Sequence, residues 1–500
     1  MLNDIWIERV KKRLHLYIFT IIGTFFLFWL QKKFEYLPVK PALVIILVLI
    51  FIIFCWSDKA EINVLLVTVP FGIIFSLISP VFEVWDEPAH FTRTAYISEG
   101  NLGLSNEKKE HYVTKDVENL VTISKYLTRR EKILPNTFET NLFQYKHEVK
   151  KEYQFRVPVT NAYGTFSYIP SVIGYKVGNL LSKGNLGVMF YLGRIFNSLF
   201  YALCAYISVK ISKKWKNFVS FFALQPMAIY ISSSFNQDAI SYGLILIVIA
   251  LFLSMVSLEN YELNWKYIAS FGFLCALLAF TKLPYIVLAG LIFFIPFNKF
   301  KNKETYLVML ISILLVITIS GIWFILYSRI TGLETTRNVD VAQQIQFIRN
   351  NTGEFLSTLF TSIFGTITKY TQLSAFAWDN QNINEIGLIT LVSFGILLSY
   401  PLPEKNISKW TKLGIIIISM IILILIYLSM YLTWTEVGAN YISGVQGRYF
   451  FGIIMILPIV FNVSKYIGDF KKNKYSDYIL QSVMIFLIIW TIAGRIGIYY

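Results

Sequence analysis

Long apolar runs follow one another along almost the whole chain, and they restrict the fold more than any other feature. A helix that crosses a bilayer needs about 17–20 mostly apolar residues, and the 500-residue chain contains thirteen such candidate runs. The expected spans are 14–30, 41–57, 63–80, 188–209, 217–233, 239–257, 267–281, 283–297, 306–328, 386–400, 412–432, 449–465 and 477–494. Apolar runs of this length cross lipid as helices, so the sequence predicts an all-α, multi-pass membrane protein.

The composition excludes an ordinary soluble protein, because 55% of the residues are hydrophobic and only 15% are charged. The formal net charge of +15 would suggest nucleic acid as the partner of a soluble domain. Here the lysines gather in short loops between apolar runs, and no basic patch is interleaved with aromatic residues, so we expect no nucleic-acid partner. The three cysteines and four histidines are too scattered to predict disulfides or a zinc cluster.

The distribution of basic residues predicts the orientation in the membrane. If the N-terminus is cytoplasmic, the short inner loops contain twenty Lys and Arg residues and the short outer segments contain six. This bias favours a plasma-membrane protein with a cytoplasmic N-terminus and an outer C-terminus. The first apolar run has a basic flank but no small-residue cleavage site, so we interpret it as an uncleaved span.

Two segments are too long to be ordinary connections, and both lie on the outer side in this topology. The first, 81–187, ends in an apolar stretch at 161–181 that Gly and Pro interrupt, which predicts an interfacial or re-entrant helix. The second, 329–385, contains two amphipathic stretches that could lie on the outer leaflet. No internal repeat or separate soluble domain is evident, so we expect a single membrane domain over 1–500.

Six ionisable residues crowd the stretch Val81–Gly100, directly after an apolar run. Pro88 suits the first turn of a helix, and Asp86 or Glu87 could cap it, so we predict a helix over 87–98. Asp86, His90 and Arg93 would then share one face, with spacings of four and three residues. The simpler alternative is a solvated helix with local ion pairs.

Other polar residues lie within or beside the expected spans, where each is a candidate functional group. The simpler alternatives are a structural salt bridge for Arg194 and a helix cap for the Asn236–Asp238 stretch. Lys282 and Arg448 lie at outer ends of spans, where positive charge has no topogenic role. They could bind an anion or simply anchor to lipid headgroups.

Several blocks occur in an order that resembles a known bacterial family. They are Trp85-Asp-Glu-Pro-Ala-His-Phe91, Arg194-Ile-Phe-Asn197, Gln225-Pro-Met with Asn236-Gln-Asp238, Thr281-Lys-Leu-Pro-Tyr285 and Gln446-Gly-Arg-Tyr449. Over about residues 60–465 the chain resembles the family called domain of unknown function 2142. That family is similar to the GT-C glycosyltransferases, which are integral membrane enzymes that use sugars linked to lipid phosphates.

The resemblance implies a GT-C-like fold of about thirteen membrane helices and a set of site residues. Asp86 would be the general base, with Glu87 and His90 as further catalytic residues. Asp86 and Glu87 would also be the ligands of Mg²⁺ or Mn²⁺ if the reaction needs a metal. The residues implied to bind the lipid phosphate or the sugar are Arg93, Asn236, Asp238, Lys282, Gln446, Arg448 and Tyr449. The implied reaction is inverting transfer of a sugar from a polyprenyl-phosphate carrier to a cell-surface glycan or lipid-linked acceptor.

Three other functions stay open at this point. A surface-polysaccharide polymerase or ligase would use the same carriers but join whole oligosaccharides. A flippase or transporter should have charged groups at mid-span or inverted repeats, whereas the ionisable residues here gather at the outer membrane edge. A purely structural or receptor role is the third alternative.

Overall fold

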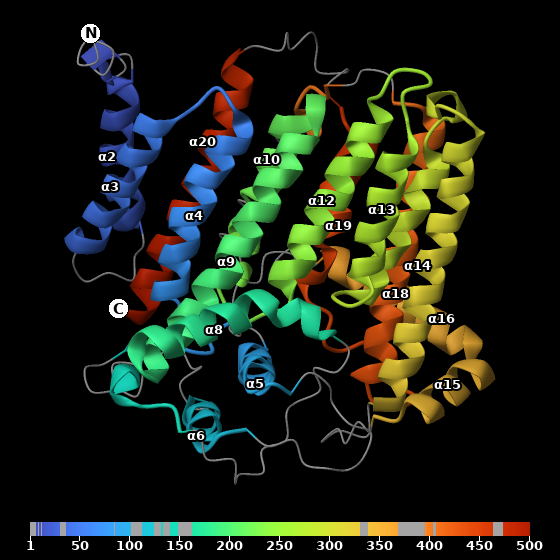
Figure 1. Cartoon of the computed structure of the whole chain (residues 1–500), viewed down its shortest axis with the longest axis horizontal. Coiled ribbons are helices and arrows are strands. Elements are labelled where there is room, and N and C mark those ends of the chain that lie inside the picture. The colour runs from blue at the N-terminus through green and yellow to red at the C-terminus, as the bar shows by residue number, and fades with distance from the viewer. Residues whose placement is uncertain are drawn as a thin grey trace.

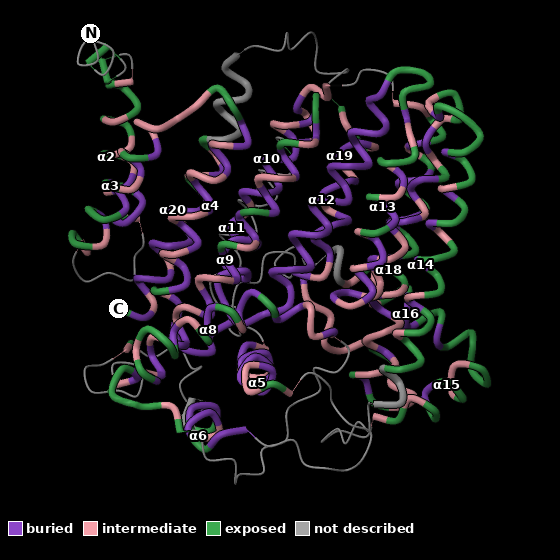
Figure 2. The backbone as a smooth tube through the Cα atoms, viewed as in Figure 1, coloured by how far each residue is buried: buried purple, intermediate pink, exposed green. Residues whose placement is uncertain are grey.

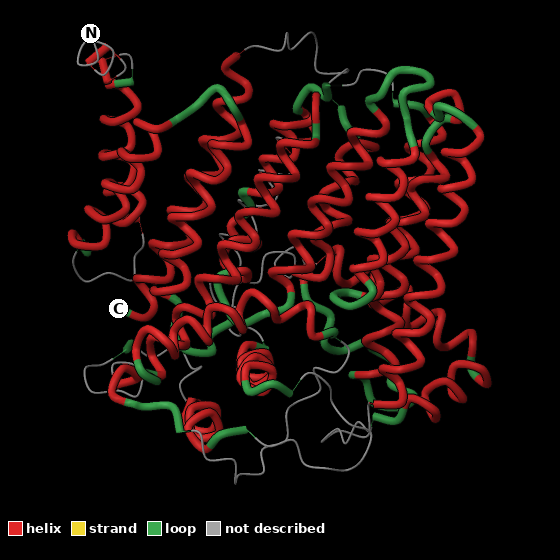
Figure 3. Tube along the Cα trace, in the orientation of Figure 1, coloured by secondary structure: helices red, strands yellow, loops and turns green. Residues whose placement is uncertain are grey.

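The computed structural model describes most of the chain. The described residues are 7–8, 10–11, 13–30, 37–84, 86–101, 113–124, 132–133, 141–148, 163–330, 339–368, 395, 397–403, 407–463 and 474–500. Within these ranges the regular structure is helical, and the β-structure is limited to two isolated bridges (Figure 3). The prediction of an all-helical chain is therefore confirmed for the part of the chain that the structure describes.

Six described helices are long and apolar enough to cross a membrane, which supports a multi-pass membrane protein. They are α4 (Ala60–Ile78), α9 (Leu186–Ile211), α12 (Asp238–Val256), α14 (Lys303–Ile330), α18 (Lys409–Thr433) and α20 (Lys474–Tyr499). The shorter apolar helices are α2 (Leu14–Leu30), α3 (Val39–Cys55), α13 (Trp265–Leu278), η4 (Leu283–Phe294), and η7 (Gly447–Phe450) continued by α19 (Phe451–Val460).

Two of the expected spans are not single α-helices. The run at 217–233 is divided into α10 (Lys216–Ala223) and α11 (Pro226–Ser232). The division falls at Gln225, which has non-helical backbone angles, because Pro226 disfavours a helical conformation in the residue before it. The run at 283–297 forms the 3₁₀ helix η4, and most of 386–400 lies outside the described residues.

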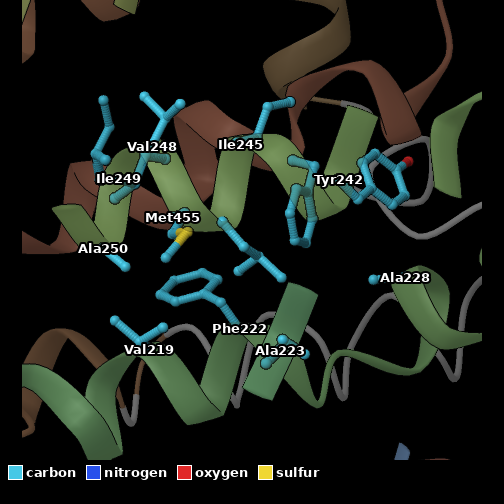
Figure 4. Packing of buried hydrophobic residues seen from close by; sticks show 14 of the residues in the cluster. Val219, Phe222, Ala223, Ala228, Tyr242, Ile245, Val248, Ile249, Ala250 and Met455 are labelled. Atoms are coloured by element: carbon cyan, nitrogen blue, oxygen red, sulfur yellow. The ribbon is translucent and has the colours of Figure 1, made fainter. Parts of the chain in front are cut away.

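Helix α12 forms the centre of the bundle. Its apolar residues are buried on all sides (Figure 2), as expected for a helix that is hydrophobic all round. It packs against α9, α13 and α19. Figure 4 shows Phe222 of α10 and Met455 of α19 beside Ile245 and Ile249 of α12. Helix α14, in contrast, has a largely exposed apolar surface at the edge of the bundle, which suits contact with lipid.

Several short helices gather at one end of the bundle, opposite the N-terminal end of α2 (Figure 1). They are α5 (Glu87–Ser98), α6 (Lys115–Ser124), α8 (Ile169–Ser182), α15 (Val341–Asn350) and α16 (Thr352–Thr368). Helix α5 has the bounds predicted from the sequence. Helices α15 and α16 cover the two stretches that were expected to be amphipathic helices.

Helix α8 lies across the ends of the longer helices, in the region expected to be interfacial or re-entrant (Figure 1). Glycine allows it to approach α9 closely, because a Cβ atom at Gly178 would lie 2.6 Å from the Cα atom of Met189. Ile173, Leu180 and Leu181 of the same helix are exposed. An apolar exposed face on a continuous helix fits the interfacial alternative.

Candidate functional site

The candidate site begins at the turn between α4 and α5. Phe82 and Asp86 in this turn have positive φ angles of 62° and 64°, a conformation that residues other than glycine seldom adopt. Asp86 occupies the N-cap position of α5, but its side chain makes no capping hydrogen bond. The capping role considered for Asp86 is therefore wrong. Its carboxylate is directed to another part of the chain, and strained backbone of this kind is common at functional sites.

Each of three acidic residues in this turn binds an arginine from a different helix. Glu83 accepts a hydrogen bond from Arg495 of α20, Asp86 from Arg448 of η7, and Glu87 from Arg194 of α9. The side chains of Glu83 and Glu87 are 2% and 0% exposed, whereas the Asp86 side chain is 37% exposed. Among these three carboxylates, Asp86 is therefore the one that a substrate can reach.

Glu87 is committed to a buried structural ion pair. The Nε and Nη2 atoms of Arg194 donate to its two carboxylate oxygens at 2.8 and 2.6 Å, and the backbone N–H of Phe235 donates to it at 2.9 Å. The remaining Arg194 donors bind the carbonyl groups of Ser76, Ser79 and Pro80 at the end of α4. The salt bridge considered for Arg194 is confirmed, and Glu87 does not face Asp86 as its partner.

Asp86 belongs to a second cluster, in which acidic and basic groups alternate. Arg448 donates to Asp86 and lies 3.6 Å from Asp238, and Lys282 donates to Asp238 at 2.6 Å. Arg448, Lys282 and Asp238 are 4%, 8% and 0% exposed. Two carboxylates and two cations balance in formal charge. We call Asp86, Asp238, Lys282 and Arg448 the charge cluster.

Tyrosine residues hold the cationic side of the charge cluster in place. The ring of Tyr449 lies 4.6 Å from Lys282 Nζ and 5.4 Å from the guanidinium carbon of Arg448, within the range of cation–π attraction. Tyr242 of α12 donates to the Arg448 carbonyl oxygen, and Tyr285 of η4 donates to that of Tyr449. The backbone that presents Arg448 is thus tied to two apolar helices.

His90 lies one turn along α5 from Asp86 and is 4% exposed. Its Nδ1 atom forms a 2.9 Å hydrogen bond with the hydroxyl of Tyr168, and its ring lies 5.6 Å from that of Tyr163. Burial lowers the pKa of His90 to about 4, and nearby Arg448 and Lys282 oppose its protonation further. His90 is therefore neutral near pH 7 and can exchange a proton but not supply a positive charge.

This pKa predicts how stability changes with pH. Because the pKa of His90 is lower in the folded than in the unfolded chain, its protonation favours unfolding. The contribution is fully present above about pH 6.5 and is lost as the pH falls toward 4. We expect wild type to lose about 2 kcal/mol of stability between pH 7 and 5 that His90→Gln does not lose. Thermal midpoints of both proteins across this range measure the difference, and identical pH profiles would contradict the prediction.

The other candidate residues lie around the charge cluster in different roles. The Asn236 side-chain oxygen accepts from the backbone N–H of Asp238, the first residue of α12, whereas the N-cap residue Gln237 makes no side-chain capping hydrogen bond. The carbonyl oxygen of Gln446 accepts from the backbone N–H of Tyr449 at the start of η7. Lys282 and Arg448 are buried in ion pairs, so headgroup anchoring does not describe them. Arg93 is buried on α5, outside the charge cluster.

The arrangement does not fit a metal ion shared by Asp86 and Glu87. Their carboxylates bind different arginines, and both oxygens of Glu87 are occupied within a fully buried pair. Among the described residues, no group of three or more His, Cys, Asp or Glu side chains converges in a way that could hold a metal. The metal-binding role expected for this pair is therefore not supported by its contacts.

Sequence reasoning did not identify the residues that support the site from a distance. Arg495 binds Glu83 in the turn between α4 and α5, and Glu83 also accepts a hydrogen bond from Tyr230. Tyr163 lies near the charge cluster, where burial and the neighbouring Tyr449 raise the pKa of its hydroxyl. Tyr163 and Tyr285 occur in stretches that the sequence marked as unusual, but no spacing linked them to Asp86.

The fold and this site define a helical multi-pass membrane protein with a buried, charge-paired site at one end of its bundle. Residues 69–457 match the model of a family described as "Predicted membrane protein (DUF2142)". The chain belongs to this family, which confirms the resemblance seen in its sequence blocks. No curated protein and no solved structure matches the chain.

Proposed function

We propose that the protein is a GT-C-like glycosyltransferase that moves a sugar from a polyprenyl-phosphate carrier to a cell-surface glycan or glycolipid. The observation that carries the proposal is the exposure of Asp86 beside buried cations. Asp86 is a carboxylate that a substrate can reach. Arg448 binds it directly, and Lys282 belongs to the same charge cluster through Asp238. A general base beside fixed cations is what attack on a sugar phosphate requires.

The proposed step forms one bond and breaks one. The oxygen of the acceptor hydroxyl attacks the anomeric carbon, while its proton passes to the Asp86 carboxylate. The bond between that carbon and the phosphate oxygen breaks, its electron pair stays with the oxygen, and polyprenyl phosphate leaves. Arg448 and Lys282 stabilise the charge that develops on the phosphate. Attack from the side opposite the leaving group inverts the anomeric configuration.

The proposal includes an orientation in the membrane. With thirteen spans and a cytoplasmic N-terminus, the end of the bundle that carries α5, α8, α15 and α16 would face outward. The short helices gather at the end opposite the start of α2, which supports this arrangement (Figure 1). The apolar surfaces of α8 and α16 would then lie at the outer leaflet, beside a membrane-bound carrier.

The transport alternative has weaker support. Asp238 is the first residue of α12, Asp86 precedes α5, and Arg448 lies in η7, directly before α19. The charge cluster therefore lies at an end of the bundle. A carrier that moves charge through the membrane needs such groups near mid-span. A polymerase or ligase would use the same base and cations and would differ in its acceptor.

Two measurements test the proposal. In a deletion strain, we expect one envelope sugar to disappear and wild-type protein to restore it. Purified protein in vesicles with envelope acceptors should convert the polyprenyl-phosphate sugar from wild-type cells into free polyprenyl phosphate, as measured by mass spectrometry of the lipids. Movement of the sugar lipid between leaflets without release of polyprenyl phosphate would refute the transferase in favour of a flippase.

A further inference from the structure

Arg93 is a buried cation that binds no carboxylate in the described structure. The residue is 3% exposed, and its Nε and Nη1 atoms are buried without a hydrogen-bond partner. The ring of Tyr96 lies 5.7 Å from the guanidinium carbon. A buried guanidinium with unused donors is costly unless an anion binds it.

The other buried arginines of the described residues show what Arg93 lacks. Arg194, Arg448 and Arg495 each donate to a carboxylate in the turn before α5 or at its first residue. Their charges are therefore balanced within the protein. Burial lowers the pKa of Arg93, and the groups that oppose this shift are the hydroxyls of Tyr168 and Tyr96, not an acid.

The position of Arg93 relates it to the proposed reaction. It lies three residues after His90, so these two residues share one face of α5. Arg93 also lies near Tyr168, whose hydroxyl binds His90. The guanidinium of Arg93 therefore lies near the His90–Tyr168 pair, one turn of α5 beyond His90.

We infer that Arg93 binds an anionic group of the acceptor, so that the acceptor is an acidic glycan or glycolipid. This inference rests on the proposed function, which assigns the carrier phosphate to Arg448 and Lys282. Arg93 has no carboxylate partner among the described residues, so it can bind a second anion, separate from that phosphate. A phosphodiester or a sugar carboxylate has the planar or tetrahedral oxygens that a guanidinium binds in pairs.

The test measures binding directly and does not need the transfer reaction. Full-length protein in detergent is heated with sodium dimethyl phosphate, sodium glucuronate or sodium chloride at equal ionic strength. We expect at least one of the two oxyanions to raise the thermal midpoint above that in chloride, and the stronger one identifies a phosphodiester or a carboxylate. Arg93→Gln should lose this rise, Arg93→Lys should keep part of it, and Arg349→Gln, at an exposed arginine of α15, should keep all of it.

The midpoint in chloride alone separates ligand binding from a structural role. Because Arg93→Gln removes an uncompensated charge, we expect its midpoint to equal or exceed that of wild type. A lower midpoint, together with an unchanged response to the oxyanions, would overturn the inference. So would a wild-type protein that responds to neither oxyanion more than to chloride.

A second variant distinguishes failure of this inference from failure of the proposed function. Arg448→Gln should bind farnesyl phosphate more weakly than wild type but retain the oxyanion response that depends on Arg93. If wild type binds no farnesyl phosphate while the response at Arg93 is present, the proposed carrier is wrong and the anion site remains. If farnesyl phosphate binds and no oxyanion response exists, the inference about the acceptor is wrong.

Discussion

Asp86→Asn is expected to reduce sugar transfer by about 10²–10⁴-fold while the protein remains folded, because the substitution removes the proposed base. The amide has nearly the same size as the carboxylate, and the side chain is partly exposed, so the change in packing is small. Release of polyprenyl phosphate by purified protein, together with restoration of the envelope sugar in the deletion strain, measures the effect at matched protein levels.

The matched control is Glu436→Gln, which changes an exposed carboxylate elsewhere in the chain in the same way. We expect this variant to transfer sugar at the wild-type rate. An Asp86→Asn protein with near wild-type transfer would show that Asp86 is not the base of the reaction. Equal thermal midpoints for the two variants are needed to attribute the loss to chemistry.

Arg194→Ala is expected to destabilise the protein by about 3–5 kcal/mol, because it leaves the Glu87 carboxylate buried without its partner. The loss also frees the carbonyl groups of Ser76, Ser79 and Pro80, which three of the arginine hydrogen bonds now satisfy. Unfolding by denaturant in mixed micelles measures the change in the free energy of unfolding.

A double substitution tests whether the uncompensated charge is the cause. Arg194→Met combined with Glu87→Met removes both charges and leaves apolar side chains of similar length. The double variant should be more stable than Arg194→Met alone, since neither charge remains buried without a partner. A double variant that is less stable than both single variants would show that hydrogen bonds to α4, not the charge, dominate.

The apolar runs were sufficient to predict the helical membrane architecture, because a helix long enough to cross lipid has a clear signature in sequence. The division at Gln225 was not predicted, because the span at 217–233 was assigned from hydropathy alone and the effect of Pro226 on the helix was not considered. The bounds of α5 were predictable because Pro88 and Gly100 mark its two ends.

The pairings within the site could not be predicted, because ion pairs between distant residues leave no local pattern. Adjacent Asp86 and Glu87 suggested a single site, yet their contacts separate them. The left-handed conformation of Asp86 directs its side chain to Arg448, while Glu87, within the helix, meets Arg194. Glu87 is therefore buried and out of reach of a substrate. This follows from the backbone conformation at Asp86, which the sequence does not indicate.

The three ion pairs between arginines and Glu83, Asp86 and Glu87 can form only in a certain order during synthesis. Their arginines follow the acids by 107, 362 and 412 residues. At roughly 5–20 residues per second, a ribosome needs about 20–80 seconds to pass from Glu83 to Arg495. Glu83 therefore has no arginine partner until α20 is synthesised. This helix lies beyond the residues that match the family model. The ion pairs of the turn that presents Asp86 are therefore complete only after α20 has been synthesised and has packed against the bundle.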